Sequence, residues 1–301
     1  MVRLDPLFFS IIIPSYRLPE RLNDCLDSLV HLRYPSDRFE VIVVDDGSEI
    51  PPIDVVSSYQ DRLNISLILQ RHSGIGKVLN LGAEQARGKF LVFTCQDCRA
   101  KPDWLSALES HLSKVTTQAV GGQILNAFPK NLYTTTTHFL FDYLRPHFFT
   151  LHNLAVPKIQ FLEMGGFDPS FEMSAGEDRD FCRRWRDRGY PMSYAPDAIV
   201  EHHHAMSFSE FWRKHWNYGQ GTFRHRFLSA RKDFRQISFE PLSFYWNLLK
   251  YPFFNGSHDR PWRSSILLFI SQVANAAGFF WQGLKDFCMS KRLCRSPEVV
   301  T

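Results

Sequence analysis

The sequence predicts an α/β fold in which helices flank a mostly parallel sheet, followed by a helical, partly apolar C-terminal appendage. The first observation is that short β-rich runs alternate with helical patterns from residue 8 to about residue 125. The second is that these runs are unbroken stretches of Ile and Val, as expected of strands buried on both faces. The third is the apolar segment 266–284, which follows the last β-rich run.

The elements can be placed in order. Four predicted strands open the chain, and apolar residues at helical spacing lie between the first and second and between the third and fourth. A further strand, a basic helix that ends at Gly189, two short strands and a Trp-rich helix follow. The predicted strands are Phe8–Ile13, Val41–Val44, Ile65–Leu69, Phe90–Thr94, Asn153–Pro157, Met192–Tyr194 and Ala198–Val200; the two later helices are Asp180–Arg188 and Phe208–Tyr218. Residues 126–152 carry a Thr run and scattered aromatics and receive no assignment.

The motifs predict how the chain divides. Residues 1–235 are expected to form one domain in two halves, 8–125 and 126–235. Residues 236–301 are expected to form a helical extension that associates with a membrane. Segment 266–284 is just long enough for a weak span, but its polar residues favour an interfacial or packed helix.

Composition narrows the class of protein. A net charge of +4 over 301 residues is too small and too scattered to indicate nucleic-acid binding. Six cysteines are too sparse for a disulfide scaffold, and the N-terminus does not resemble a signal peptide. The sequence therefore favours a cytosolic protein. The basic residues beside the apolar segment favour peripheral contact with the cytoplasmic membrane face, and they are Lys285, Lys291, Arg292 and Arg295.

Candidate ligand-binding residues follow three predicted strands. In open parallel sheets, ligands bind at the carboxyl ends of the strands. The residues at these ends are Pro14, Ser15 and Tyr16, then Asp45, Asp46, Gly47 and Ser48, then Gln96 and Asp97. Asp45 and Asp46 can accept hydrogen bonds from a nucleobase or a ribose hydroxyl, although Asp-Gly is also a turn signal.

Asp97 and the histidine run 202–204 are candidate metal ligands. A carboxylate at a strand end suits Mg²⁺ or Mn²⁺ that bridges two phosphates, while a turn or capping acid is the structural alternative. Alternation along extended backbone sends His202 and His204 to one side. Cys95 and Cys98 form a C-x-x-C pair, but a zinc or redox role needs further ligands, which the histidines could supply.

Gly176, Glu177 and Asp178 precede the predicted basic helix. Either acid can satisfy free N–H groups at the start of the helix. A helix start also fixes a carboxylate firmly, as a general base requires. Basic residues near the Trp-rich helix form a solvated face or neutralise a diphosphate, and they are Arg213, Lys214, Arg224, His225, Arg226, Arg231 and Lys232.

Taken in order, these motifs resemble family-two glycosyltransferases, which are inverting enzymes of the GT-A fold. The nucleotide-sugar half is carried by Ile11–Tyr16, Val43–Ser48, Gly74, Lys77–Gly82, Ala86–Gly88 and Phe93–Asp97, and the acceptor half by Gly165–Asp168, Gly176–Asp178, Gly189-Tyr190, Pro196–Ala198 and His202. The resemblance covers roughly residues 8–221. At one position the chain departs from the family: Cys95 stands where the D-x-D motif usually opens with an acid.

The resemblance implies a reaction and assigns the roles in it. Asp178 is the expected base, and Asp97 and His202 are the expected ligands of Mn²⁺ or Mg²⁺. Gly176 and Glu177 belong to the acceptor side. The donor site, for a nucleoside-diphosphate sugar, is expected to comprise Pro14, Tyr16, Asp45, Asp46, Lys77, Gln96 and Asp97. The expected acceptor is a hydroxyl of a glycan or lipid-linked molecule, which attacks in a single displacement.

Three other functions are alternatives for this sequence. A catalytically weak or inactive nucleotide-sugar-binding scaffold at the membrane keeps the fold and takes Cys95 as a mark of lost chemistry. A nucleotidyltransferase is disfavoured because the loop after the first strand, Pro14–Pro19, lacks glycines. A dinucleotide-dependent dehydrogenase is disfavoured because no G-x-G-x-x-G follows that strand.

Overall fold

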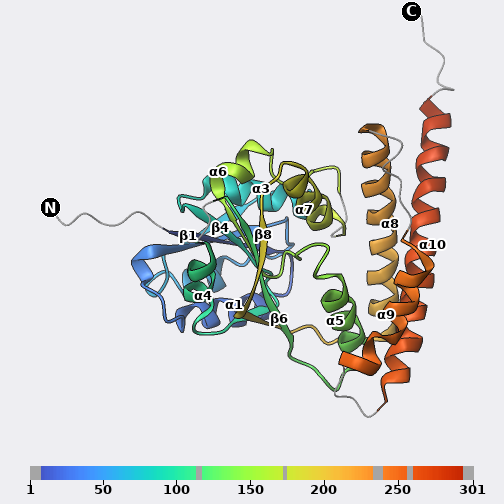
Figure 1. The fold of residues 1–301 in the computed structure, drawn as a ribbon. Helices are drawn as coiled ribbons and strands as arrows, with labels where there is room; N and C mark the ends of the chain where they lie inside the picture. The colour runs from blue at the N-terminus through green and yellow to red at the C-terminus, as the bar shows by residue number, and fades with distance from the viewer. Residues whose placement is uncertain (1–7, 113–116, 172–174, 233–239, 256–259, 294–301) are drawn as a thin grey trace, which may run out of the picture.

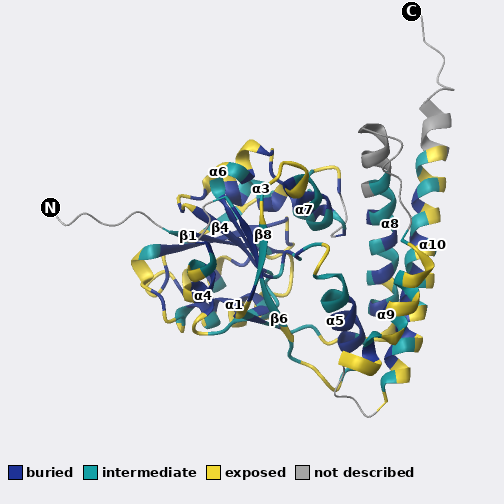
Figure 2. Ribbon diagram, in the orientation of Figure 1, coloured by how far each residue is buried: buried dark blue, intermediate teal, exposed yellow. Residues whose placement is uncertain are grey.

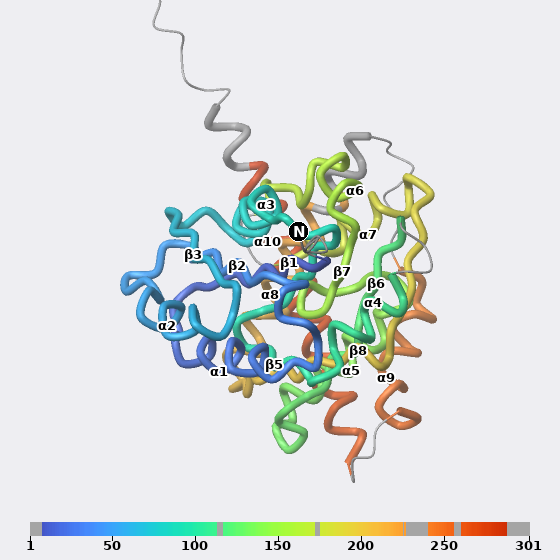
Figure 3. The backbone as a smooth tube through the Cα atoms, turned by 90° about the vertical axis from the view of Figure 1, so that its left-hand side faces the viewer, coloured from blue at the N-terminus to red at the C-terminus, as the bar shows by residue number. Residues whose placement is uncertain are grey.

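The computed structural model describes residues 8–112, 117–171, 175–232, 240–255 and 260–293, with only the backbone of 225, 227–232 and 288–293. Its centre is one eight-stranded sheet in the order β3-β2-β1-β4-β7-β6-β8-β5. Figure 3 shows β3, β2, β1, β7 and β6 following one another across the molecule. The strands are β1 Phe9–Ser15, β2 Phe39–Asp45, β3 Ile65–Leu69, β4 Phe90–Phe93, β5 Cys98–Ala100, β6 Ala119–Asn126, β7 Leu154–Pro157 and β8 Met192–His202.

The first four strands run parallel, as their sequence predicts. β1 pairs with both β2 and β4, and β2 pairs with β3. The Ile and Val side chains of β1 and β2 are buried because helices cover both faces. Ser15 is in register with Asp45, so the carboxyl ends of β1 and β2 meet at one edge. β7 is antiparallel to both β4 and β6, β6 is parallel to β8, and β5 is antiparallel to β8.

Two apolar cores fill the space between the sheet and its helices. One core joins the sheet to α1 and α4, and the other joins it to α3, α6 and α7. Figure 1 shows these two groups on opposite faces. The helices are α1 Pro19–Val30, α2 Ile53–Ser57, α3 Ile75–Gln85, α4 Trp104–Leu112, α5 Leu132–Leu144, α6 Lys158–Glu163, α7 Glu177–Asp187, α8 Phe208–Lys232, α9 Leu242–Asn255 and α10 Pro261–Leu293, with a short 3₁₀ turn at Ser36–Arg38.

The prediction of separate strands at Met192–Tyr194 and Ala198–Val200 is wrong, because both belong to the single strand β8. Ala195 is opposite Gly122 and Ile199 is opposite Gln123, so three residues of β8 bulge out between consecutive partners. Pro196 is one of the three. A proline has no N–H to give to a sheet, and a bulge accommodates it without ending the strand.

Helix α5 lies within residues 126–152, for which the sequence predicted neither helix nor strand. Thr134, Thr135, Thr136 and Thr137 are buried within it, although β-branched residues are weak helix formers. The hydroxyls of Thr136 and Thr137 donate to the carbonyls of Leu132 and Tyr133, four residues earlier, at 2.7 and 3.0 Å. These bonds satisfy the buried hydroxyls inside the helix itself.

Helices α8, α9 and α10 form a layer beside the sheet domain (Figure 1). α8 and α10 lie with their backbones in contact, because a Cβ added at Gly219 or Gly278 would overlap a carbonyl oxygen of the other helix. α10 is long and apolar enough, by length and composition, to cross a membrane. The boundary expected at residue 235 stays a prediction. Lys291 and Arg292 have no described side chain, and Arg295 lies outside the described residues.

Candidate active site

A clamp joins the ends of β1 and β4 at the carboxyl edge of the sheet. The backbone N–H of Tyr16 donates to Oε1 of Gln96 at 3.3 Å, and Nε2 of Gln96 donates to the carbonyl of Tyr16 at 3.2 Å. Pro14, half-buried, and Ser15, buried, are the last residues of β1 before this clamp. Two of the predicted donor residues, Tyr16 and Gln96, are therefore held together although they lie 80 residues apart.

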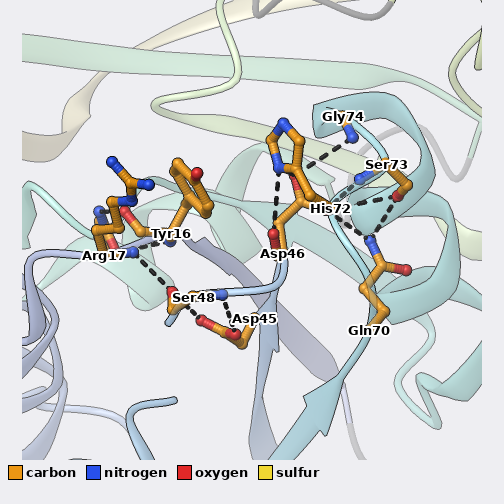
Figure 4. A network of polar contacts seen from close by, with 10 residues as sticks. Tyr16, Arg17, Asp45, Asp46, Ser48, Gln70, His72, Ser73 and Gly74 are labelled. Atoms are coloured by element: carbon orange, nitrogen blue, oxygen red, sulfur yellow. Dashed lines mark hydrogen bonds and ion pairs between the residues drawn. The ribbon is translucent and has the colours of Figure 1, made fainter. Parts of the chain in front are cut away.

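Asp45 is 1% exposed and organises the loop that follows β2. Its carboxylate accepts hydrogen bonds from the N–H and the hydroxyl of Ser48, at 2.9 and 2.6 Å (Figure 4). The Ser48 hydroxyl oxygen in turn accepts from the N–H of Arg17 at 2.7 Å. Arg17 and Leu18 both adopt the left-handed region, with φ of 57° and 56°. Each costs about 1–2 kcal/mol there, so these contacts hold a strained loop beside the strand ends.

Asp46 holds the loop between β3 and α3. Oδ1 accepts from Ser73 N–H at 2.8 Å and from Gln70 Nε2 at 3.1 Å, and Oδ2 accepts from Gly74 N–H at 3.2 Å. The ring nitrogen Nδ1 of His72 lies 2.9 Å from Oδ2 (Figure 4). The turn role weighed for this acid is thus present, and the same contacts fix the start of α3.

An exposed aromatic pair lies above these acids. The rings of Tyr16 and His72 are 4.9 Å apart with an interplanar angle of 33°, and 37% of Tyr16 is exposed. Sequence reasoning missed His72, because it lies in the irregular loop after β3 and no spacing marks it. Lys77 is exposed on α3 and is not among the residues that line the cavity described below.

Asp97 lies where β5 and the end of β8 meet. Its Oδ2 is 3.5 Å from Nε2 of His202, 3.2 Å from Nδ1 of His204 and 3.6 Å from Nη1 of Arg21. Antiparallel pairing causes this, since Cys98 of β5 is in register with His202 of β8. His203 faces the other way, toward Glu201 at 3.5 Å, as strand alternation predicts.

The charges of this cluster suit a divalent cation. Burial alone would raise the pKa of Asp97, but the neighbouring His202 and His204 hold that pKa well below its usual range. Burial lowers the pKa of His202, although Asp97 acts in the opposite direction. An ionised carboxylate beside imidazole nitrogens is a common donor set for divalent metals. One donor atom each from Asp97, His202 and His204 lies within 4.8 Å of the others.

His138 of α5 contacts Nδ1 of His202, the ring nitrogen that does not face Asp97. Its Nε2 is 3.2 Å from Nδ1 of His202, and burial lowers the pKa of His138 to about 3. Because His138 is neutral and the backbone of Ile124 takes a hydrogen bond from it, its Nε2 is the acceptor and His202 Nδ1 is the donor. Nε2 of His202 then carries a lone pair. That atom is buried with no hydrogen-bond partner among the described residues, so it fits a metal ligand.

Asp178 lies in the first turn of α7, which Gly176 opens with φ of 98°. Its Oδ1 accepts from the N–H of Arg179 at 2.7 Å. Burial raises the pKa of Asp178 to about 6, although this hydrogen bond opposes the shift. Glu177 is 4% exposed, its Oε2 has no hydrogen-bond partner among the described residues, and burial raises its pKa well above the usual range.

One cavity of about 280 Å³ joins the two halves of the site. Asp178 and Glu177 line it, and so do Cys95 and His152, which neighbour Asp97. Lys214 of α8 also lines it, and burial lowers the pKa of this lysine while Asp97 raises it. Sequence reasoning named Lys214 only within a larger basic group. The aromatic wall comes from α5, α9 and the loop after α5, and comprises Phe141, Phe148, Phe244 and Tyr245.

Comparisons with known proteins show the family and the fold of this chain. The sequence profile of the family described as Glycosyl transferase family 2 matches residues 10–167. Glycosyltransferase AglE from Haloferax volcanii is 29% identical over 224 residues, which cover 71% of this chain and 72% of AglE. Validoxylamine A glucosyltransferase from Streptomyces hygroscopicus is 29% identical over 227 residues, covering 63% of this chain and 50% of that protein.

Solved structures share the fold. The mannosyltransferase PcManGT from Pyrobaculum calidifontis, solved in complex with GDP-Man and Mn²⁺, superposes with a TM-score of 0.64 at 18% identity. The match covers 91% of this chain and 89% of that one. Residues 1–349 of TarS from Staphylococcus aureus, solved in complex with UDP-GlcNAc, superpose with a TM-score of 0.53 at 18% identity, with the same two coverages. The predicted GT-A fold is confirmed.

Proposed function

The chain belongs to glycosyl transferase family 2, and on that premise we propose that it transfers a sugar from a nucleoside-diphosphate sugar to an acceptor hydroxyl with inversion of configuration. The observation that carries this proposal is the cavity that Asp178 shares with Cys95 and His152, the neighbours of Asp97. A base at one end and a cation-binding cluster at the other suit attack on a sugar whose diphosphate departs.

Asp178 serves as the base. It removes the proton from the acceptor hydroxyl while that oxygen bonds to the anomeric carbon and the bond to the diphosphate breaks. Attack from the face opposite the leaving group inverts the configuration. The N–H of Arg179 fixes the orientation of the carboxylate, and a pKa of about 6 leaves it ionised at neutral pH.

Cationic groups stabilise the leaving diphosphate. Asp97 and His202 hold a divalent ion, with His204 as a further donor. When bound, that ion, Mn²⁺ or Mg²⁺, neutralises the diphosphate oxygens. Lys214 reaches the same cavity from α8 and adds a second cation that belongs to the chain itself.

The donor nucleotide lies along the strand edge. Tyr16 and His72 offer an exposed ring pair on which a base can stack, while Asp45 and Asp46 shape the two loops beneath it. The remaining donor residues proposed are Pro14, Gln96, Asp97 and, near the phosphates, Lys77.

The acceptor enters from the helical layer. Gly176 and Glu177 lie on that side of the cavity, and α5, α8, α9 and α10 all contribute to its walls. Aromatic and apolar walls suit a glycan or lipid-linked acceptor, because sugar rings and alkyl chains both pack on aromatic faces.

The helical layer also offers a surface for a membrane. Between Arg263 and Lys285 the exposed side chains of α10 are apolar and recur at helical spacing. Ser264, Ser271 and Gln282 are buried. Figure 2 shows exposed and buried residues alternating along this helix. The exposed apolar residues include Trp262, Ile266, Phe269, Val273, Phe280, Leu284 and Phe287; we call them the outer stripe. A helix with its apolar face outward and its polar face inward suits an apolar exterior, so we place the enzyme peripherally on the cytoplasmic membrane face.

The assay that tests the reaction offers the full chain a panel of nucleoside-diphosphate sugars with Mn²⁺. It follows both nucleoside diphosphate release and the anomeric configuration of the product. We expect Asp178→Asn to fold normally and to lose about 10²–10⁴-fold in transfer rate. Asp187→Asn, at the exposed end of the same helix, is the matched control. Full activity of Asp178→Asn, or retention of configuration, contradicts the proposal, and no turnover with any donor favours the binding scaffold instead.

A further inference from the structure

On the cavity side of Asp97 lie two further donors, Cys95 and His152, that the proposed reaction does not use. Cys95 Sγ, a ring nitrogen of His152 and a carboxylate oxygen of Asp97 lie within 4.8 Å of one another. In tetrahedral zinc sites the metal–ligand distances of about 2.0–2.3 Å put neighbouring donors roughly 3.3–3.8 Å apart. Small side-chain rotations therefore suffice to bring these three atoms onto one ion.

The backbone brings these residues together. β4 and β7 are antiparallel, with Phe93 opposite Leu154, so the residues just beyond this pair face each other across the ladder. The hydroxyl of Thr94 donates to the carbonyl of His152 at 3.0 Å and fixes this approach. Nδ1 of His152 is 3.2 Å from the hydroxyl of Thr150, which leaves Nε2 available to a ligand. A metal-binding histidine is commonly held this way through its other nitrogen.

A separate observation also points to a cation at this place. Nε2 of His202 is buried, is 3.5 Å from the Asp97 carboxylate and has no hydrogen-bond partner among the described residues. The ring of His152 lies 4.7 Å from the ring of His202. A buried lone pair beside a carboxylate, a thiol and a second imidazole is a costly arrangement unless a ligand satisfies it.

We propose that Cys95 and His152 complete, with Asp97, a binding site for a borderline divalent ion such as Zn²⁺ or Co²⁺ on the cavity side of the cluster. Sulfur and imidazole donors favour such ions, whereas Mg²⁺ and Mn²⁺ prefer oxygen. The inference rests on the metal position proposed at Asp97. It adds a softer class of ion on the cavity side of that carboxylate, where Cys95 and His152 take the place of His202 and His204 as donors.

The test uses Co²⁺, which replaces Zn²⁺ in such sites and absorbs strongly in the near ultraviolet when a thiolate binds it. Titrating the full chain with Co²⁺ alone should produce this charge-transfer band, saturating at one equivalent. Cys95→Ser should abolish the band. Cys98→Ser is the matched control, because Cys98 belongs to the same C-x-x-C pair but is not in the donor set, and it should retain the band. If Cys98→Ser does not fold, Cys182→Ser, a buried thiol in α7, takes its place.

Calorimetry supplies the second arm. Zn²⁺ affinity should fall ~10-fold or more in Cys95→Ser and in His152→Gln. Cys95→Asp should shift the preference toward Mn²⁺, because it replaces sulfur with oxygen. No charge-transfer band in the unmodified chain, a band that persists in Cys95→Ser, or unchanged Zn²⁺ affinity overturns the inference. No sugar donor is present in either arm, so failure of the transfer reaction would be recognised separately.

Discussion

Asp178 and Glu177 are adjacent, line the same cavity and are both shifted toward the protonated form by burial. The two carboxyls still differ. The N–H of Arg179 stabilises the anion of Asp178 and keeps its pKa near 6, while Oε2 of Glu177 has no such donor among the described residues. At neutral pH Asp178 is ionised and can accept a proton, while burial and the neighbouring Asp178 carboxylate favour the protonated form of Glu177.

This difference predicts how activity depends on pH. A base must be ionised, so kcat/KM for transfer should fall tenfold per pH unit below about pH 6 and level off above it. The measurement is kcat/KM between pH 5 and 8 with metal and acceptor held constant. Asp187→Asn should reproduce the same curve. A flat profile across this range would mean that Asp178 does not titrate in the reaction.

His138 is predicted to act on metal binding without being a ligand. His138→Phe keeps a ring of similar size but removes the acceptor that fixes Nδ1 of His202, so Mn²⁺ affinity should fall about 10–100-fold. Calorimetry with Mn²⁺ and a nucleoside diphosphate measures it. His111→Gln, a histidine paired with Asp197 away from the cavity, should not change the affinity. Equal affinity in His138→Phe would show that His202 needs no such support.

At the level of elements, the sequence predicts the first four strands most accurately, because in each of them a short apolar run coincides with a parallel strand. β3 matches its predicted range, and the runs in β1, β2 and β4 are found within a residue or two at each end. α5 was not predictable because its Thr run favours strands, and only tertiary burial and back-bonded hydroxyls make it helical. β5 and β6 lie beyond the Ile-rich stretches, and β5 is only three residues long.

The candidate site, too, could be predicted from the sequence only in part. Acids at strand ends were predictable because parallel topology alone brings them to one edge, and β8 placed His202 and His204 on one side by alternation. His138, His152 and Lys214 were not, since each reaches the cluster from a different element through packing that no spacing encodes. Their roles depend on burial, which appears only once the chain is folded.

The contact between α8 and α10 gives a prediction about stability. A side chain at Gly278 would overlap the carbonyl of Trp216, so Gly278→Val should separate the helices and cost about 1–3 kcal/mol. Ala276→Val, on the exposed side of α10, is the control and should change little. Thermal unfolding followed by circular dichroism measures both. Equal midpoints for the two variants would show that the helices separate without cost.

At the scale of the whole molecule, the sheet domain and the helical layer contribute different parts of the candidate site. The sheet edge carries the proposed donor residues and the cluster of Asp97, His202 and His204, while the helical layer closes the cavity and presents the outer stripe to the exterior (Figure 2). The charge-free stretch of α10 lies between Arg263 and Lys285, so both ends of the stripe carry cations that suit lipid phosphates.

The outer stripe predicts vesicle binding. The full chain should co-sediment with vesicles that contain anionic lipid, and the double substitution Phe269→Glu, Phe280→Glu should reduce the bound fraction by roughly tenfold or more, since each buried phenyl contributes about 1.5–3 kcal/mol. Ile50→Glu alters a still more exposed apolar residue on the sheet domain, and this variant should bind like the original chain. Unchanged binding of the double variant would move the membrane contact elsewhere or remove it.

The matched family profile ends at residue 167, yet α7, α8, α9 and α10 carry the proposed base, Lys214 and much of the cavity wall. On the proposed assignment, the donor-binding residues lie within the matched segment, and the surface that meets the acceptor hydroxyl lies mostly beyond it. The choice of acceptor is then a property of the C-terminal helices, while the choice of donor belongs to the segment that the family profile matches.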